Sequence, residues 1–140
     1  MSVKIMVIDD SEAICQMCKK ALENEAKVEV FTDPKEALEH FSTEFFDLAL
    51  IDMRLPGSGM DGIEILNEIK KISNSTDTML MTAFPSSSRI TEEAARLGVY
   101  DFLFKPIEIN NLRLRVKKCL EKRKLNEQIT DLKKKLNEMK

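Results

Sequence analysis

The sequence contains no tryptophan, one tyrosine, one histidine and only three cysteines among 140 residues. Three cysteines are too few for the disulfide framework of a small secreted scaffold. No apolar run approaches the roughly 18 residues that a membrane-spanning helix needs. The N-terminal stretch MSVKIMVIDD ends in two acids and has no small-residue cleavage site, unlike a signal peptide. These absences exclude membrane, secreted-scaffold and collagen-like proteins and predict a cytoplasmic domain.

The composition is typical of one globular domain with at most one appendage. Hydrophobic residues make up 43% of the chain and charged residues 33%, which argues against disorder. Charge is divided unevenly: residues 1–107 hold 11 basic and 19 acidic side chains (formal charge −8), whereas residues 108–140 hold 11 basic and 5 acidic ones (+6). An acidic body disfavours nucleic-acid binding, which requires positive charge to displace counterions.

Five short apolar segments alternate with five segments of helical periodicity. The expected strands are 3–8, 27–32, 48–51, 78–82 and 99–104. The expected helices run from about 11 to 25, from Pro34 through Phe41, from Gly62 through Ile69, from the Ser86–Ser88 cluster to Leu97, and throughout the chain beyond Pro106. This alternation predicts parallel βαβ units. We therefore expect an α/β fold: a doubly wound, flavodoxin-like parallel sheet of order 2-1-3-4-5 with an extended C-terminal helix.

Polar side chains follow directly after four of these strands. They are Asp9–Asp10, Asp52, Thr82 and Lys105. Since the carboxyl ends of parallel strands meet at one edge of the sheet, these groups should share a small site. Close carboxylates repel one another unless a cation intervenes. Lys105 supplies one positive charge, and an all-oxygen site with few protein ligands suits Mg²⁺.

Each of these residues alone has an ordinary explanation. An aspartate after a strand is often only a helix N-cap, and Lys105 or Thr82 alone would be a solvated loop residue. Phe102 alone would be a core residue. Their joint occurrence at four successive strand ends favours a functional site instead.

The segments VIDDS, LALIDMRLP, MLMTA and FLFKP resemble those of the receiver domain of two-component response regulators. The resemblance covers about residues 3–120, and its motifs follow in the right order. It implies that Asp52 is the phosphoacceptor, a nucleophile that takes a phosphoryl group from a phosphohistidine. It also implies that Asp10 and Asp52 bind Mg²⁺ directly, with Asp9 acting mainly through water and the backbone carbonyl of Arg54 as a further ligand.

The same resemblance implies a conformational switch beside the phosphoacceptor. Thr82 matches the switch hydroxyl and Phe102 the switch aromatic. Lys105 would pair with a phosphoryl oxygen, and its bond to Pro106 would be cis. The nine residues MRLPGSGMD between Asp52 and Gly62 are two more than the family usually has, and the extra length falls in Gly57–Gly59.

The C-terminal segment has no helix breaker between about residues 108 and 138. Some 31 residues at 1.5 Å each span roughly 45 Å, so the end of this helix must project from a compact body. Leu125, Ile129, Leu132, Leu136 and Met139 are spaced as an a/d seam, but the phase slips at Glu121–Lys124. We predict a receiver domain over residues 1–121 and a coiled-coil linker over 122–140. A solvated amphipathic helix is the alternative, because two heptads are few.

The resemblance implies a phosphorelay protein that receives its phosphoryl group from a sensor histidine kinase or phosphotransfer protein. Phosphorylation would change the face of the fourth helix, fifth strand and fifth helix. That face would pair two copies of the chain or control an effector domain beyond the linker. The alternative is a degenerate receiver that serves only as an interaction or dimerisation module. We expect no membrane binding and no nucleic-acid binding by this segment.

Other functions fit the motifs poorly. A haloacid-dehalogenase-type phosphatase needs a second acid two residues after its nucleophile, where this chain has Ser11 and Arg54. A flavin-binding electron carrier binds phosphate at its first loop, which here is the acidic DDSEA. Cys15 and Cys18 are expected to be buried packing residues. No four-ligand zinc set is evident. The single histidine, His40, is expected at the surface near the end of a helix.

Overall fold

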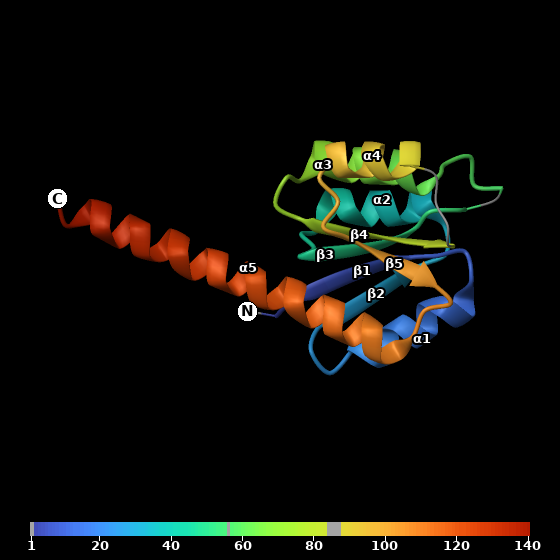
Figure 1. Cartoon of the computed structure of the whole chain (residues 1–140), viewed down its shortest axis with the longest axis horizontal. Coiled ribbons are helices and arrows are strands. Elements are labelled where there is room, and N and C mark those ends of the chain that lie inside the picture. Colours follow the sequence, from blue (N-terminus) through green and yellow to red (C-terminus); the bar gives the residue numbers. More distant parts are fainter. Residues whose placement is uncertain (1, 56, 84–87) are drawn as a thin grey trace.

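The computed structural model describes residues 2–55, 57–83 and 88–140 and shows helices packed on both faces of a sheet (Figure 1). Strands and helices alternate along the chain. The strands are β1 (Lys4–Ile8), β2 (Lys27–Phe31), β3 (Leu48–Asp52), β4 (Asp77–Ala83) and β5 (Asp101–Lys105). The helices are α1 (Glu12–Leu22), α2 (Pro34–Thr43), α3 (Gly62–Ile72), α4 (Ser88–Arg96) and α5 (Ile109–Glu138).

All four strand pairings are parallel, and the sheet order is β2-β1-β3-β4-β5. The predicted fold class and sheet order are therefore confirmed. Helices α1 and α5 cover one face of the sheet, and α2, α3 and α4 cover the other (Figure 1). Strand β3 lies at the centre and all five of its residues are buried. This burial explains its continuous apolar sequence LALI, which is typical of a strand covered on both faces.

The two faces of the sheet carry two separate hydrophobic cores, because successive strand side chains point to opposite faces. Ile5 and Leu50 belong to the core beneath α1 and α5, whereas Met6 and Ile51 belong to the core beneath α2 and α3. All three cysteines are buried and free, as expected for packing residues. Burial raises the pKa of Cys15 to about 11 and that of Cys18 and Cys119 to about 12.

The fifth strand begins two residues later than the sequence predicted. Gly98 has a φ of +82° at the end of α4, and the backbone N–H of Val99 still donates to the carbonyl of Ala94, 3.1 Å away. Val99 therefore belongs to the helix cap, although it is β-branched and apolar. At the other end of this helix, Ser88 is its first residue, whereas the rest of the expected Ser86–Ser88 cap lies outside the described residues.

Helix α5 is continuous over 30 residues, and its C-terminal half leaves the body (Figure 1). Leu112, Val116 and Cys119 are buried against the sheet. Among the described residues, Arg123 makes the last ion pairs along this helix, to Asp77 at 2.9 Å and Asp47 at 3.3 Å. The predicted phase slip at Glu121–Lys124 thus has a physical reason, since Arg123 contacts the body rather than continuing the seam.

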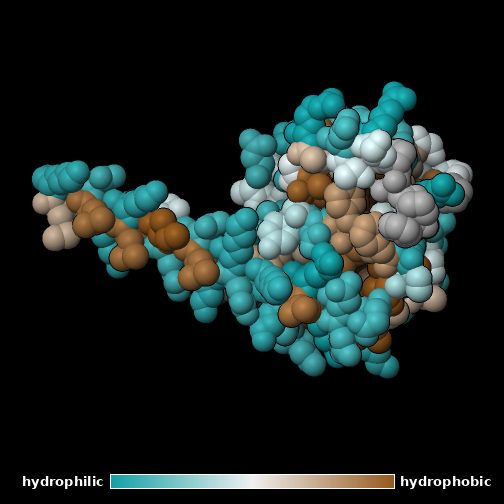
Figure 2. Space-filling view, in the orientation of Figure 1, coloured by the Kyte–Doolittle hydropathy of each residue, from teal (hydrophilic) through white to brown (hydrophobic). Residues whose placement is uncertain are grey.

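Beyond Arg123 every residue of α5 is exposed to solvent. The five seam residues are 49–82% exposed and form a hydrophobic stripe along the projecting helix (Figure 2): Leu125, Ile129, Leu132, Leu136 and Met139. Among the described residues, no helix has the length and apolar character needed to cross a membrane.

Candidate functional site

Three aspartates meet at the carboxyl ends of β1 and β3, which are neighbours in the sheet. Each of Asp9, Asp10 and Asp52 has a carboxylate oxygen within 4.8 Å of the other two. Asp9 is fully buried and Asp52 nearly so, whereas Asp10 is exposed. Two carboxylates are therefore held inside the sheet edge while the third faces solvent.

The turn from β1 into α1 fixes the first of these acids. The N–H of Ser11 donates to Asp9 Oδ1 at 2.9 Å, and the N–H of Asp9 donates to the carbonyl of Phe31 on β2 at 3.1 Å. Ser11 also caps α1 by accepting a hydrogen bond from the N–H of Ile14. The sequence DDS thus orients one carboxylate and begins a helix at the same time.

Lys105, the last residue of β5, brings a positive charge to the buried pair. Its Nζ lies 3.0 Å from Asp9 Oδ2 and 3.1 Å from Asp52 Oδ1. The Lys105–Pro106 bond is cis, as the resemblance implies. Burial alone would lower the pKa of Lys105, but its hydrogen bonds to Asp9 and Asp52 outweigh burial and raise it. Lys105 is therefore an ammonium ion at neutral pH.

The same surroundings favour the neutral form of Asp52, whereas they favour the charged form of Lys105. Burial, together with the negative charge of Asp9, raises the pKa of Asp52 to about 6, although the hydrogen bond from Lys105 and the N–H of Arg54 both lower it. One ammonium thus faces three carboxylates and leaves an excess of negative charge. This imbalance is what a divalent cation would relieve.

The donor set of the site suits a hard divalent cation such as Mg²⁺. All three side chains are carboxylates, and their oxygens are close enough to share one ion. Apart from the ammonium of Lys105, 3.0 Å away, the buried Asp9 Oδ2 has no hydrogen-bond partner in the described part of the chain. The residues present therefore fit the ion that the sequence predicted.

A cavity of about 240 Å³ opens beside the acids and reaches Met53, Arg54 and Ala83 as well as Asp10, Asp52 and Lys105. Thr82 is buried, and its hydroxyl donates to the carbonyl of Ala83 at 3.2 Å. Its neighbour Ala83, not Thr82, lines the cavity. The switch role of Thr82 and the ligand role of the Arg54 carbonyl stay predictions.

The second predicted switch residue, Phe102, lies on β5 and is partly buried. It packs against the core beneath α2, α3 and α4 and pairs with Leu80 in the sheet, two residues before Thr82. Thr82 and Phe102 therefore face the same side of the sheet, because strand side chains alternate. Their proximity is compatible with a joint change, and the role of Phe102 stays a prediction.

The lengthened loop follows the cavity-lining Arg54 in the chain and is held by hydrogen bonds of Ser58. The Ser58 hydroxyl donates to the carbonyl of Leu55 at 2.6 Å and accepts from the N–H of Met60 at 3.3 Å. Gly57 and Gly59 flank it with φ values of +79° and +80°. Only glycine adopts such values without strain, so the sequence GSG builds this turn.

Gly62 is a structural residue of the site that the motif comparison did not single out. Its N–H donates to the carbonyl of Met53 at 3.0 Å, and a Cβ built on it would lie 2.8 Å from the carbonyl oxygen of Asp52. Asp61 and Glu64 form a capping box that starts α3 at this point. The start of α3 therefore packs directly on the backbone that carries Asp52.

Comparisons with known proteins agree with this geometry. The family model of the response regulator receiver domain matches residues 5–117. Sporulation initiation phosphotransferase F of Bacillus subtilis is 34% identical over 122 residues, which are 86% of this chain and 95% of that protein. The transcriptional regulatory protein ZraR of Escherichia coli is 33% identical over 120 residues, 85% of this chain and 26% of that protein. The chain thus spans about a quarter of the length of the ZraR relatives that it matches.

Solved structures show the same similarity in three dimensions. A CheY-like response regulator receiver domain protein from Methanospirillum hungatei is 28% identical with a TM-score of 0.83, covering 90% of this chain and 99% of that one. The BeF3-activated receiver domain of DrrB, from Thermotoga maritima, is 29% identical with a TM-score of 0.77, covering 86% and 99%. The sheet, the acids at its edge and these relatives point to one family.

Proposed function

The chain belongs to the response regulator receiver domain family, and on this premise we propose that it accepts a phosphoryl group on Asp52 in two-component signalling. One observation carries the proposal. Asp52 is a buried carboxylate that lines an open cavity and lies 3.1 Å from the ammonium of Lys105. Asp9 does not line that cavity, and among the described residues the ion pairs of Lys105 are with Asp9 and Asp52, not with Asp10. Asp52 is therefore the acid best placed for attack on an incoming phosphoryl group.

The transfer requires little more than positioning and charge stabilisation. A carboxylate oxygen of Asp52 attacks the phosphorus of a phosphohistidine whose other ring nitrogen is protonated. The P–N bond breaks, its electron pair stays on the ring, and the histidine leaves as neutral imidazole. Lys105 stabilises the charge that develops on the phosphoryl oxygens. We propose that Asp10 and Asp52 hold Mg²⁺ directly, that the backbone carbonyl of Arg54 is a further ligand, and that Asp9 acts mainly through water. The ion would neutralise the charge between the acid and the phosphoryl group.

The metal requirement is the most direct test of this proposal. Acetyl phosphate and Mg²⁺ should add one phosphoryl group to the chain, and a chelator such as EDTA should prevent the addition, because three carboxylates repel an anionic donor without the ion. Intact-mass spectrometry measures the added group. An unmodified chain in Mg²⁺ would instead favour the degenerate receiver that acts only as an interaction module.

We also propose that phosphorylation is transmitted from Thr82 and Phe102 to the face formed by α4, β5 and α5. Thr82 precedes the cavity-lining Ala83, and Phe102 lies on the neighbouring strand β5, where it pairs with Leu80, two residues before Thr82. Arg115 ties β5 to α5 through an ion pair of 2.6 Å with Asp101. A change at the cavity would therefore reach the surface that contacts partners.

The projecting end of α5 supports a homodimer as one output of this switch. In the division into a receiver over 1–121 and a linker over 122–140, the seam has Ile129 and Leu136 at a and leucine at two of the three d positions. A β-branched residue at a, here Ile129, with leucine at d favours a parallel pair of helices. We propose a sensor histidine kinase or phosphotransfer protein as donor in the cytoplasm, and an effector domain C-terminal to the linker.

Sedimentation with and without beryllofluoride, a phosphoryl mimic, tests the dimer. The mimic should raise the sedimenting mass of the wild-type chain toward that of two copies. Ile129→Lys should prevent the increase, because it puts a charge into the seam, whereas Lys134→Glu, outside the seam, should not. Identical mass in both states would contradict a phosphorylation-driven dimer.

A further inference from the structure

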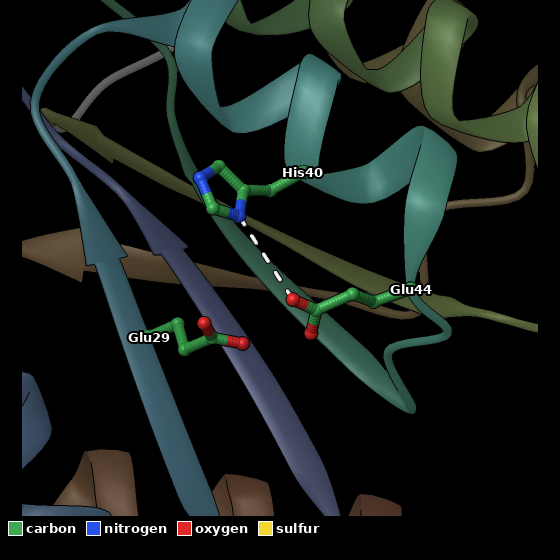
Figure 3. Close-up of side chains that lie close together, drawn as sticks. All are labelled: Glu29, His40 and Glu44. Atoms are coloured by element: carbon green, nitrogen blue, oxygen red, sulfur yellow. Dashed lines mark ion pairs between the residues drawn. The ribbon is translucent and has the colours of Figure 1, made fainter.

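A second group of metal-ligating side chains lies on the edge strand β2 and the adjacent helix α2 (Figure 3). Glu29, His40 and Glu44 each place one ligand atom within 4.8 Å of the other two. His40 and Glu44 are one helical turn apart, and His40 Nδ1 lies 3.9 Å from Glu44 Oε1. The carboxylate of Glu29 points from β2 toward the same space (Figure 3). This group shares no residue with the three-aspartate site.

The carboxylate of Glu29 is incompletely paired. Its Oε2 is buried and has no hydrogen-bond partner among the described residues. The ammonium of Lys4 is 3.7 Å away, beyond hydrogen-bond reach. Buried polar atoms in native proteins are nearly always hydrogen-bonded, so this carboxylate oxygen, which has only a long ion pair with Lys4, has room for a cation at closer range.

We propose that Glu29, His40 and Glu44 bind a divalent first-row transition-metal ion such as Zn²⁺. The imidazole selects this class of ion, since Mg²⁺ and Ca²⁺ prefer oxygen ligands alone. Three protein ligands leave a fourth position for water. The three side chains are 25–44% exposed, so they have room for the small shifts that close their ligand atoms around one ion.

Lys4 competes with the ion for the same two carboxylates. Its ammonium hydrogen-bonds to Glu44, forms the longer ion pair with Glu29, and lies 4.8 Å from the ring centroid of Phe46. The hydrogen bond from Lys4 lowers the pKa of Glu44, which is therefore an ionised ligand at neutral pH. Removing the ammonium should strengthen ion binding, because the two positive charges no longer share one pair of acids.

The bound ion would join α2 to the edge strand. His40 lies on α2, Glu44 is the C-cap residue of that helix, and Glu29 lies on β2, so one ion would bridge the two elements. An ion that binds the folded chain alone stabilises it by mass action. The site would therefore act on stability and leave phosphotransfer at Asp52 intact.

The test uses the fact that His40 is the only histidine in the chain. Its imidazole signals in an NMR spectrum therefore report on this site alone. Zn²⁺ is titrated into the full chain in excess Mg²⁺, which keeps the three-aspartate site filled. We expect the His40 signals to shift and to saturate at one ion per chain.

Four variants separate a built site from a surface histidine that binds zinc alone. Glu29→Gln and Glu44→Gln should each weaken Zn²⁺ binding by about tenfold or more, and Lys4→Met should strengthen it. Glu39→Gln, an exposed neighbour on the same helix, should leave the affinity unchanged, and circular dichroism checks that all four variants fold. The proposal is overturned if Zn²⁺ leaves the His40 signals unmoved, or if Glu29→Gln binds Zn²⁺ as tightly as the wild-type chain.

Discussion

Asp52→Asn should abolish phosphorylation of the chain by acetyl phosphate while the fold stays intact. The amide has the shape of the carboxylate but lacks the anionic oxygen that attacks phosphorus. It also removes one charge from a crowded group, where burial and Asp9 already raise the pKa of Asp52. Intact-mass spectrometry after incubation with acetyl phosphate and Mg²⁺ should show one phosphoryl group on the wild-type chain and none on the variant.

Asp61→Asn is the matched control, because it makes the same chemical change outside the cavity. Asp61 caps α3 by accepting a hydrogen bond from the N–H of Glu64, and asparagine caps helices about as well as aspartate. This variant should be phosphorylated like the wild-type chain. A phosphoryl group retained on Asp52→Asn would remove Asp52 as the acceptor, and its position by peptide mapping would identify the acid that replaces it.

The sheet was predictable because its strands are short and buried, and their sequences differ sharply from the helices between them. The apolar run LALI of β3 has this character, since both faces of that strand are covered. Once the strands are placed, the sheet edge follows. Asp9, Asp52 and Lys105 must then lie at that edge, because each directly follows or ends a strand of one parallel sheet.

Two features that depend on exact backbone geometry or on contacts between distant segments were not predictable in the same way. The sequence places Val99 in a strand, but the residue belongs to the cap of α4, because Gly98 bends the chain back toward Ala94. In the sequence, Arg123 only interrupts the hydrophobic seam. The structure gives the reason, because Arg123 forms ion pairs with Asp47 and Asp77. The two ion pairs of Arg123 join residues more than forty positions apart, and nothing in local periodicity encodes them.

The group of Glu29, His40 and Glu44 shows the same limit at a candidate site. The spacing of His40 and Glu44 on one helix face is visible in the sequence. Glu29 joins them only because β2 is the edge strand over which α2 packs. Glu29 can therefore be recognised as the third candidate ligand only from the folded structure.

Gly62→Ala should destabilise the chain, although alanine is the better helix former. Helix propensity favours alanine over glycine by up to about 1 kcal/mol. Here, however, an added Cβ would lie 2.8 Å from both the carbonyl oxygen of Asp52 and the Cα of Met53, which are backbone atoms that side-chain rotation cannot move. Overpacking of this kind costs about 1–3 kcal/mol. We expect the free energy of unfolding, measured by urea denaturation, to fall by about 2 kcal/mol.

Gly57→Ala distinguishes this contact from an effect of glycine replacement in general. A Cβ at Gly57 meets nothing within 4 Å, so only its φ of +79° opposes the substitution, at a cost of about 1–2 kcal/mol. The two variants should differ in a second measurement. Gly62→Ala displaces the backbone that carries Asp52 and should also slow phosphorylation by acetyl phosphate, whereas Gly57→Ala should slow it less. A Gly62→Ala chain as stable as wild type would show that α3 does not pack on the strand end as closely as the geometry requires.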